Sequence, residues 1–337
     1  MESRTFSYLR QQASALILIA TSMVAIAAVA PALAGLKIVK DIPLPGQPTR
    51  WDYMSFDPVR QQLAIAHLGD STVVVVNPGE GKVVGTISGI SDVHGVLAVP
   101  ESGRIYATAT GSNQVVVIDA QTFQIIARVP TGRYPDGLAY APNSQKVYVS
   151  DAHGQSETVI DARTNRRIAT IPLGGSVGNT QYDSETQHIF VNGQGRHELV
   201  EIDPATDKIV QRIPLPGAEG NHGLEIDTKR RLAFIACEGN DRLLVLDLKT
   251  KAVVSTFRVA GGPDVLAYDD KLGKLYVASE GGTVYLFSVD DRGVRSAGEM
   301  AIGMNAHTIA VDPSSHEVYL PVNYPDGKAL LKIFTLR

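Results

Sequence analysis

Short runs of β-branched and aromatic residues, separated by turn-forming residues, fill the chain after residue 35. Such runs have the composition of β-strands, and the Pro, Asn, Asp, Ser and Gly clusters between them predict turns. The unit 135–174 shows the pattern most clearly, with four expected strands at Leu138–Tyr140, Lys146–Ser150, Thr158–Asp161 and Arg167–Pro172. No part of the unit keeps a 3.6-residue apolar period, so helix is disfavoured. The unit is therefore predicted to be a four-stranded antiparallel meander.

This unit recurs around the chain at steps of 42, 42, 42, 44, 42 and 43 residues. The seven first strands are expected to begin near Asp52, His94, Asp136, Gly178, His222, Asp264 and His307. Self-similarity at this period is typical of propeller blades. The sequence therefore predicts an all-β fold, a seven-bladed β-propeller with four antiparallel strands in each blade.

The two ends of the repeat array predict how the ring closes. The seventh unit stops after its third strand, at 329–335, whereas an extra strand stands at the other end. That segment, Lys37–Gly46 (KIVKDIPLPG), closely matches the fourth strand Lys208–Gly217 (KIVQRIPLPG). The N-terminal strand is thus expected to complete the last blade, which removes exposed sheet edges. Residues 35–337 are predicted to form one domain.

The first 34 residues differ in composition from the repeats. Arg4 and Arg10 precede an apolar segment, Ala13–Val29, and Ala32-Leu33-Ala34 supplies small residues before Gly35. This order is typical of a secretory signal peptide, so residues 1–34 are predicted to be removed. A periplasmic or secreted protein with no stable membrane anchor is the expected result. The alternative is a retained anchor, because the apolar run is long enough to span a bilayer.

Charge and cysteine usage narrow the possible functions. Removing residues 1–34 changes the formal net charge from −4 to −5, and no basic cluster is present, which argues against nucleic-acid binding. Cys237 is the single cysteine and lies in an apolar strand, so we expect a buried, unreactive thiol. The phosphate-binding Gly-x-x-x-x-Gly-Lys-Ser/Thr motif is absent, and no nucleotide cofactor is expected. The Gly-x-Ser-x-Gly and calcium-loop motifs are absent as well.

Units such as KVYVSDA, TVIDART and RIATIPLG resemble the YVTN-type repeats of YncE-like seven-bladed β-propellers. The resemblance covers residues 36–337 and implies the fold and an exported location. Related seven-bladed propellers serve as lactonases, lyases, metal enzymes and binding platforms. The resemblance therefore implies no single activity.

Candidate chemistry gathers where the first strands begin. In a meander the start of strand one and the end of strand two share a face, so equivalent residues of all seven units are expected around one channel mouth. Histidines at this position belong to blades two, five and seven, a nearly trigonal arrangement. Three converging imidazoles can bind Zn, Cu or Fe. We predict a divalent transition-metal site formed by His94, His222 and His307 with Asp52.

Further ionisable residues are expected near the same mouth. Asp136 and Asp264 stand on blades next to the histidines, and His67, His153 and His197 are expected in loops after second strands. These five residues are the candidates for moving protons if the site is catalytic. The loop histidines are individually expected to be solvated. In the alternative interpretation the mouth is simply polar, with Asp and His bonding local backbone at the strand starts.

Three functions remain open from the sequence. The favoured one is an exported propeller that binds a transition metal or a small ligand at the His/Asp mouth. The second is a metal-dependent enzyme of lactonase, lyase or oxidase type that uses the same site. The third is a protein-interaction scaffold without a metal.

Overall fold

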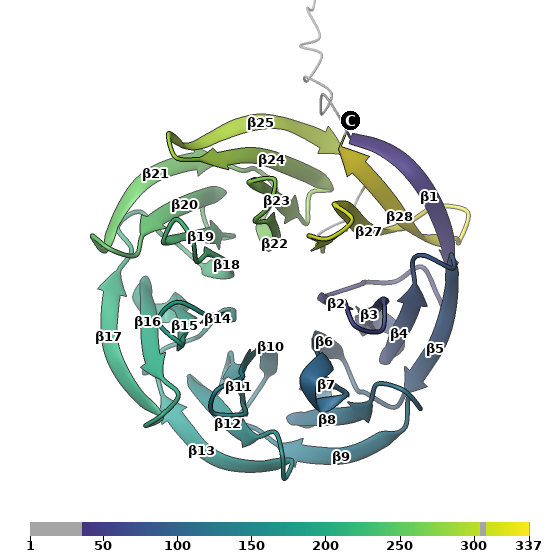
Figure 1. The fold of residues 1–337 in the computed structure, drawn as a ribbon, viewed down its shortest axis with the longest axis horizontal. Helices are drawn as coiled ribbons and strands as arrows, with labels where there is room; N and C mark the ends of the chain where they lie inside the picture. Colours follow the sequence, from purple (N-terminus) through teal and green to yellow (C-terminus); the bar gives the residue numbers. More distant parts are fainter. Residues whose placement is uncertain (1–35, 304–307, 337) are drawn as a thin grey trace, which may run out of the picture. The chain divides into compact units, whose positions relative to one another are not determined.

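The structure is a computed structural model that describes residues 36–303 and 308–336. It consists of seven four-stranded antiparallel sheets arranged as blades around a central channel (Figure 1). The fold prediction is confirmed. The predicted signal peptide at 1–34 and the predicted metal ligand His307 lie outside the described residues.

Each blade runs outward from the channel in chain order. The innermost strands are β2 (Met54–Asp57), β6 (Val93–Val99), β10 (Pro135–Ala141), β14 (Thr180–Asp183), β18 (Asn221–Asp227), β22 (Pro263–Asp269) and β26 (Ala310–Asp312). The second strands are β3 (Gln62–His67), β7 (Arg104–Ala109), β11 (Lys146–Asp151), β15 (His188–Gly193), β19 (Leu232–Cys237), β23 (Lys274–Ser279) and β27 (Glu317–Asn323).

The outer half of each blade follows the same order. The third strands are β4 (Thr72–Asn77), β8 (Gln114–Asp119), β12 (Ser156–Asp161), β16 (Glu198–Asp203), β20 (Arg242–Asp247), β24 (Thr283–Asp290) and β28 (Ala329–Leu336). The outermost strands are β5 (Lys82–Ser88), β9 (Ile125–Pro130), β13 (Arg166–Pro172), β17 (Lys208–Pro214), β21 (Ala252–Arg258), β25 (Gly293–Ala301) and β1 (Leu36–Leu44). Short 3-10 turns are η1 (Leu68–Asp70), η2 (Pro100–Ser102), η3 (Thr110–Ser112) and η4 (Gln194–Arg196).

Ring closure occurs as predicted. β1 pairs antiparallel with β28, from Leu36 opposite Leu336 to Leu44 opposite Ala329. The N-terminal strand therefore supplies the outer edge of the last blade, and the chain's two ends hold the ring together (Figure 1). Among the described residues no helix is long and apolar enough to cross a membrane.

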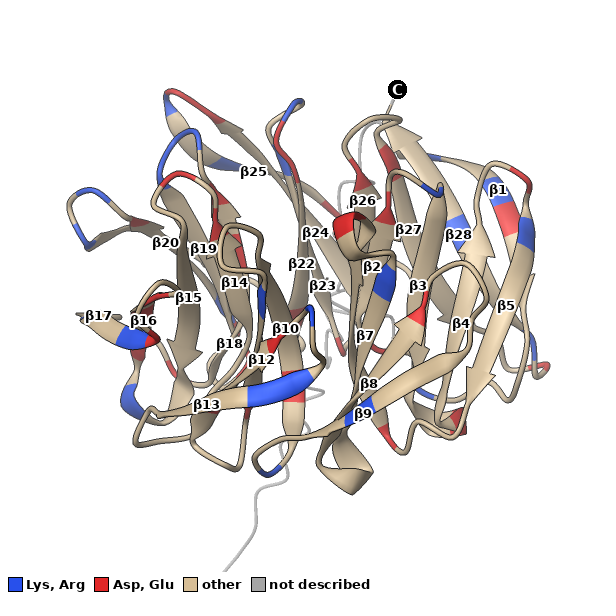
Figure 2. Ribbon diagram, turned by 60° about the horizontal axis from the view of Figure 1, so that its bottom comes forward, with Lys and Arg blue, Asp and Glu red and all other residues tan. Residues whose placement is uncertain are grey.

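The core lies between neighbouring blades. Six of the seven second strands place one large aromatic at an equivalent position, where β3 has Ala64, and these side chains are almost fully buried: Tyr106, Tyr148, Phe190, Phe234, Tyr276 and Tyr319. Cys237 is buried among apolar residues, and burial raises the pKa of its thiol to about 12, as expected of an unreactive cysteine. Charged residues cluster at the turns and outer strands, while the inner strand bodies carry few of them (Figure 2).

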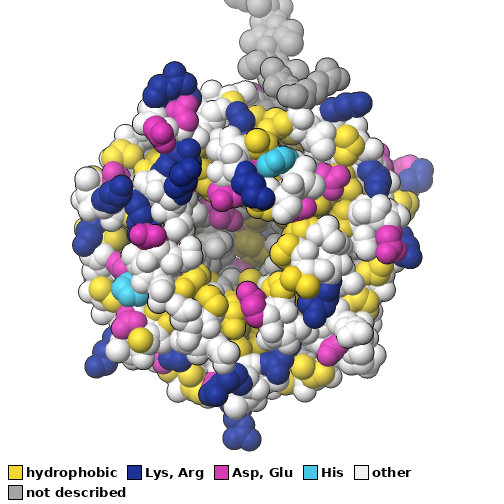
Figure 3. All heavy atoms as spheres, in the orientation of Figure 1, with side chains coloured by type: hydrophobic (Ala, Val, Ile, Leu, Met, Phe, Trp, Pro, Cys, Tyr) yellow, Lys and Arg dark blue, Asp and Glu magenta, His cyan; other side chains and the backbone are white. Residues whose placement is uncertain are grey.

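In blades two to five the hairpin after the third strand is held by its aspartate, as the repeated Asp and Thr predict. The Asp119 carboxylate accepts the backbone N–H of Gln121 and Thr122 at 3.0 and 2.8 Å. Asp161 and Asp247 repeat these bonds in their own blades. The ring that results is hollowed at its centre, with hydrophobic side chains visible inside the hollow (Figure 3).

Candidate functional site

A cavity of about 460 Å³ lies at the mouth of the channel, where the first strands begin. Its described lining is rich in ionisable groups and predominantly acidic. The lining contains five carboxylates, three imidazoles and one guanidinium: Asp52, Asp136, Glu238, Asp264 and Glu280; His94, His153 and His222; and Arg50. Six of the predicted site residues therefore share one cavity: Asp52, His94, Asp136, His153, His222 and Asp264.

His222 is the point where the mouth residues of several blades meet. Its Nε2 lies 3.6 Å from Oδ2 of Asp136 and 3.6 Å from Oδ1 of Asp264. The Tyr53 hydroxyl, which comes from the first blade, lies 3.3 Å from the same nitrogen. Burial disfavours the imidazolium, but the carboxylates, with Asp264 and Asp136 strongest, outweigh burial and raise the pKa of His222.

Asp136 is a buried carboxylate with one uncommitted oxygen. The residue is 4% exposed, and its Oδ1 accepts no hydrogen bond from any residue of the described chain. Burial raises the pKa of Asp136, while His222 and His94 oppose the rise. A buried carboxylate oxygen of this kind is costly unless a cation or donor reaches it. This oxygen is consistent with a ligand role at the mouth.

Arg50 joins three of the carboxylates on one side of the cavity. Its guanidinium lies 2.9 Å from Oε1 of Glu280, 3.4 Å from Oδ2 of Asp52 and 3.8 Å from Oδ2 of Asp264. Asp52 and Asp264 are almost fully buried, whereas Arg50 is 41% exposed. The single guanidinium therefore leaves the lining with an excess of negative charge.

On the neighbouring second blade, His94 is held by two hydrogen bonds. Its Nδ1–H donates to the backbone oxygen of Asp92 at 2.8 Å, which leaves Nε2 as an acceptor for the Tyr134 hydroxyl at 3.1 Å. The Tyr134 ring also packs on His153, with ring centroids 4.2 Å apart. Tyr134 has φ of +61°, a conformation rarely adopted by bulky residues. The backbone of Tyr134 is therefore strained at the point where its side chain lines the mouth cavity.

Two of the predicted loop histidines do not line the cavity. His67 is the last residue of β3 and is fully buried, with its ring stacked 3.7 Å from that of Trp51. The expectation that it is solvated is wrong, because Trp51 and the Thr49 hydroxyl, 2.9 Å from Nε2, enclose it. His197 is exposed beyond η4 with φ of +52°, and it fits the solvated interpretation.

Buried polar side chains in the second strands hold the mouth in place. Asn192 donates through Nδ2 to the backbone oxygens of His222 at 2.8 Å and Gly223 at 3.0 Å. Thr108 donates to the backbone oxygen of Asp136 at 3.0 Å in the same way. Each bond joins one blade to the first strand of the next. Asn192 and Thr108 therefore position His222 and Asp136 relative to one another.

Glycines after the mouth residues allow neighbouring blades to approach closely. A Cβ at Gly223 would lie 1.9 Å from the backbone oxygen of Asp264, and one at Gly95 would lie 2.1 Å from that of Asp136. Real Cβ atoms do not come so near an oxygen, so these positions require glycine. The close approach is what brings Asp264 within reach of His222.

Arg50, Tyr53 and Tyr134 are among the lining residues that the sequence analysis missed. Arg50 and Tyr134 each stand two positions before a mouth aspartate, so the repeat itself carried the signal. Tyr53 stands directly after Asp52, at a position where three other blades have glycine.

No group of three or more His, Cys, Asp or Glu side chains within 36–303 and 308–336 is arranged as a ready metal site. His222, Asp136 and Asp264 nevertheless offer imidazole and carboxylate donors, the two donor types that were predicted for the metal site. Two ligands that share an ion at about 2.0–2.2 Å each stand no more than about 4.4 Å apart, and both 3.6 Å separations satisfy this limit. These separations allow a shared ion, but the three side chains are not yet aimed at a common point. A metal bound by His222, Asp136 and Asp264 would require them to turn towards one another.

Comparisons with known proteins bear on the fold. No curated protein matches the sequence. Hydrazine synthase of Kuenenia stuttgartiensis superposes with a TM-score of 0.75 at 15% identity, over 86% of this chain and 96% of that chain. The WD40 repeats of RRP9 superpose with a TM-score of 0.75 at 12% identity, over 91% of this chain and 99% of that chain.

At such low identity these two likenesses show a shared propeller architecture and nothing of its chemistry. A family model is more specific. The model described as YNCE-like beta-propeller matches residues 12–316, which is most of the chain. This chain, with its seven closed blades, belongs to the YncE-like β-propeller family.

Proposed function

We propose that this protein is a binding propeller whose acidic mouth takes up a small cation, with a divalent transition-metal ion as the ligand class. The observation that carries the proposal is the charge of one cavity, where five carboxylates face one guanidinium. Buried carboxylates need a compensating cation, and the Oδ1 of Asp136 has no partner within the described chain. Mixed imidazole and carboxylate donors suit Zn and other transition metals.

Three residues would hold the ion: His222 through Nε2, and Asp136 and Asp264 through their carboxylates. Asn192 fixes the backbone of His222, and Thr108 fixes that of Asp136. His94 would become a further ligand only if its Nε2 gave up the hydrogen bond with the Tyr134 hydroxyl. The predicted participation of His307 stays a prediction.

Calorimetric titration of metal-free protein with ZnCl2 and CuSO4 tests the proposal directly. We expect micromolar binding of at least one ion, weakened at least tenfold in His222→Ala and in Asp136→Asn. His188→Gln is the matched control, because His188 begins β15 and its Nδ1 is already paired with Glu201 at 2.6 Å, away from the mouth lining. Wild-type protein that binds neither ion, or that binds equally well without His222 and Asp136, would overturn the proposal.

Activity and metal-binding measurements on the same metal-free protein distinguish the two alternatives, a metal-dependent enzyme and a metal-free scaffold. Turnover of lactone substrates that disappears with chelator and returns with metal would indicate an enzyme. If the protein binds no metal, the metal-free interaction scaffold is the function that remains.

We also propose that the protein acts outside the cytoplasm, in the periplasm or after secretion. The basic, apolar and small-residue order of residues 1–34 supports this location. N-terminal sequencing of protein expressed with the full chain should find Gly35 as the first residue. Full-length protein retained in the membrane fraction would contradict the proposal and favour an anchor.

A further inference from the structure

A second cavity, of about 610 Å³, occupies the other half of the channel, and neither the family nor the mouth chemistry accounts for it. All seven innermost strands contribute to its lining. Tyr53 lines both cavities and lies between them. The cavity is large enough for a drug-sized organic molecule.

Most residues that line the cavity are apolar, and the two carboxyl-bearing residues among them are Glu225 and Asp312. Three positions after the mouth residue, the seven repeats place side chains at the same level of the channel: Ser55, Leu97, Ala139, Gln181, Glu225, Ala267 and Ala310. Six of these residues are neutral, so the fold does not require an acid at this level. Glu225 is the exception.

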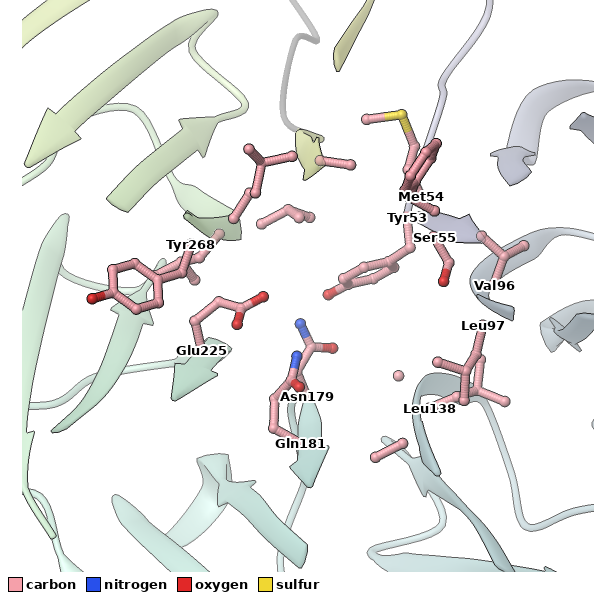
Figure 4. A pocket seen from close by; sticks show the side chains of 18 of the residues that line it. Tyr53, Met54, Ser55, Val96, Leu97, Leu138, Asn179, Gln181, Glu225 and Tyr268 are labelled. Atoms are coloured by element: carbon pink, nitrogen blue, oxygen red, sulfur yellow. The ribbon is translucent and has the colours of Figure 1, made fainter. Parts of the chain in front are cut away.

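The Glu225 carboxyl points into the open space, towards the Tyr53 hydroxyl and the Asn179 amide (Figure 4). The described residues that line the cavity include no lysine or arginine, so none of them supplies a cation for this carboxylate. The lining of the same cavity also includes the apolar residues Leu138, Leu224 and Leu266. A carboxylate in such surroundings is stabilised by a cation that brings its own apolar surface.

We propose that this cavity binds a small organic amine, with its ammonium group on the Glu225 carboxylate and its apolar body against the leucines. The side-chain amides of Asn179 and Gln181 stand at the same end of the cavity as the Glu225 carboxyl (Figure 4). A bare metal ion fits poorly, because Glu225 is the single carboxylate at this level of the channel. The proposed amine site is distinct from the cation site at the mouth.

Burial supports this assignment by raising the pKa of Glu225 to about 8. At neutral pH the empty site therefore carries a protonated carboxyl, and an arriving ammonium ion displaces that proton. The residues beside Glu225 on β14 and β22 at this level are Gln181 and Ala267, which do not titrate. The lining contains one other carboxylate, that of Asp312, which accepts hydrogen bonds from Ser314 and Ser315. Its remaining ionisable side chains are four tyrosines, which burial keeps neutral by raising their pKa: Tyr53, Tyr140, Tyr182 and Tyr268.

Calorimetry with 2-phenylethylamine and its neutral analogue 2-phenylethanol tests the proposal. At pH 7 we expect the amine to bind at least tenfold more tightly than the alcohol, since a charged hydrogen bond is made only by the amine. Titrations in buffers of different ionisation enthalpy should show nearly one proton released for each amine bound. Glu225→Gln should weaken amine binding at least tenfold, abolish proton release and leave alcohol binding unchanged.

The matched control is Glu101→Gln, because Glu101 is an exposed glutamate in η2, beyond the end of β6, and does not line the cavity. It should bind the amine as wild type does. Leu97→Trp enlarges a half-buried side chain of the cavity lining on the second blade and should abolish binding, which keeps the test open if Glu225→Gln folds poorly. Equal affinities for amine and alcohol, or full amine affinity in either cavity variant, would overturn the proposal.

Discussion

The Tyr53 hydroxyl lies 3.3 Å from Nε2 of His222, although the two residues belong to the first and fifth blades of the ring. Tyr53 occupies the repeat position at which three other blades have glycine (Gly95, Gly137 and Gly223), and it lines both cavities of the channel. It therefore separates the acidic mouth from the apolar cavity beyond it. This contact is the structural link between the two sites that we propose.

The contact predicts a specific change in the Tyr53→Phe variant. Loss of the hydroxyl should shift the side-chain ¹⁵N resonance of His222 while lowering the free energy of unfolding by only about 1 kcal/mol. Tyr134→Phe is the matched control, since its hydroxyl is 3.1 Å from His94 and should alter the His94 resonance instead. Unchanged His222 resonances in Tyr53→Phe would show that the hydrogen bond does not form in solution.

Arg50 should act as a built-in competitor for cations at the mouth. Its guanidinium pairs with Glu280, Asp52 and Asp264, so Arg50→Gln adds one unit of negative charge to the cavity and releases these carboxylates. We expect zinc affinity to rise about tenfold in calorimetry, because Coulombic attraction is strong in a partly desolvated site. Arg128→Gln, which removes an exposed arginine of β9, should leave the affinity unchanged. Weaker zinc binding in Arg50→Gln would instead make Arg50 part of the binding site.

Asn192→Ala should reduce stability because it removes three side-chain hydrogen bonds between neighbouring blades. The loss should be about 1–3 kcal/mol, since the Gly223 and His222 oxygens lose a donor in a dry environment. Urea unfolding followed by circular dichroism measures this free energy. Asn240→Ala, which removes a single more exposed bond to the Gly217 oxygen at 2.9 Å, should cost less than half as much. Equal losses would contradict the positioning role of Asn192.

Glu157 should make the protein less stable as pH rises. Its side chain is fully buried, neither carboxyl oxygen has a hydrogen-bond partner within the described chain, and burial together with Asp151 raises its pKa well above the usual value. A group with a raised pKa in the folded state binds its proton more tightly there than in the unfolded chain. Its favourable contribution is thus complete below the unfolded pKa of about 4.3 and is lost as pH rises towards the folded pKa.

The length-matched variant Glu157→Met lacks this proton. Between pH 4.5 and 7 its free energy of unfolding should gain about 1–3 kcal/mol relative to wild type, as measured by urea unfolding at several pH values. Glu185→Met removes an exposed glutamate and should show no such trend. A constant difference between Glu157→Met and wild type across this range would mean that Glu157 finds a partner in solution.

The amino-acid sequence by itself determined the architecture. The 42-residue period, the alternation of apolar runs and turns, and the copy of a fourth strand at 37–46 predict seven blades and their closure, and both predictions are confirmed. Periodicity suffices here because every blade packs against its neighbours in the same way, so the strands of one unit predict those of the others. It also placed Asp52, His94, Asp136, His222 and Asp264 around one mouth.

Only the tertiary structure decided how far each side chain reaches and what encloses it. A repeat position gives the angle around the ring, but the distance to the axis depends on neighbours such as Gly95 and Gly223, which no position in the same blade reveals. His67 shares the mouth end of its blade yet is buried against Trp51, whereas Tyr53 crosses the channel to His222. These contacts join residues of different blades or of distant segments, and packing between them, rather than local pattern, sets the chemistry of the channel.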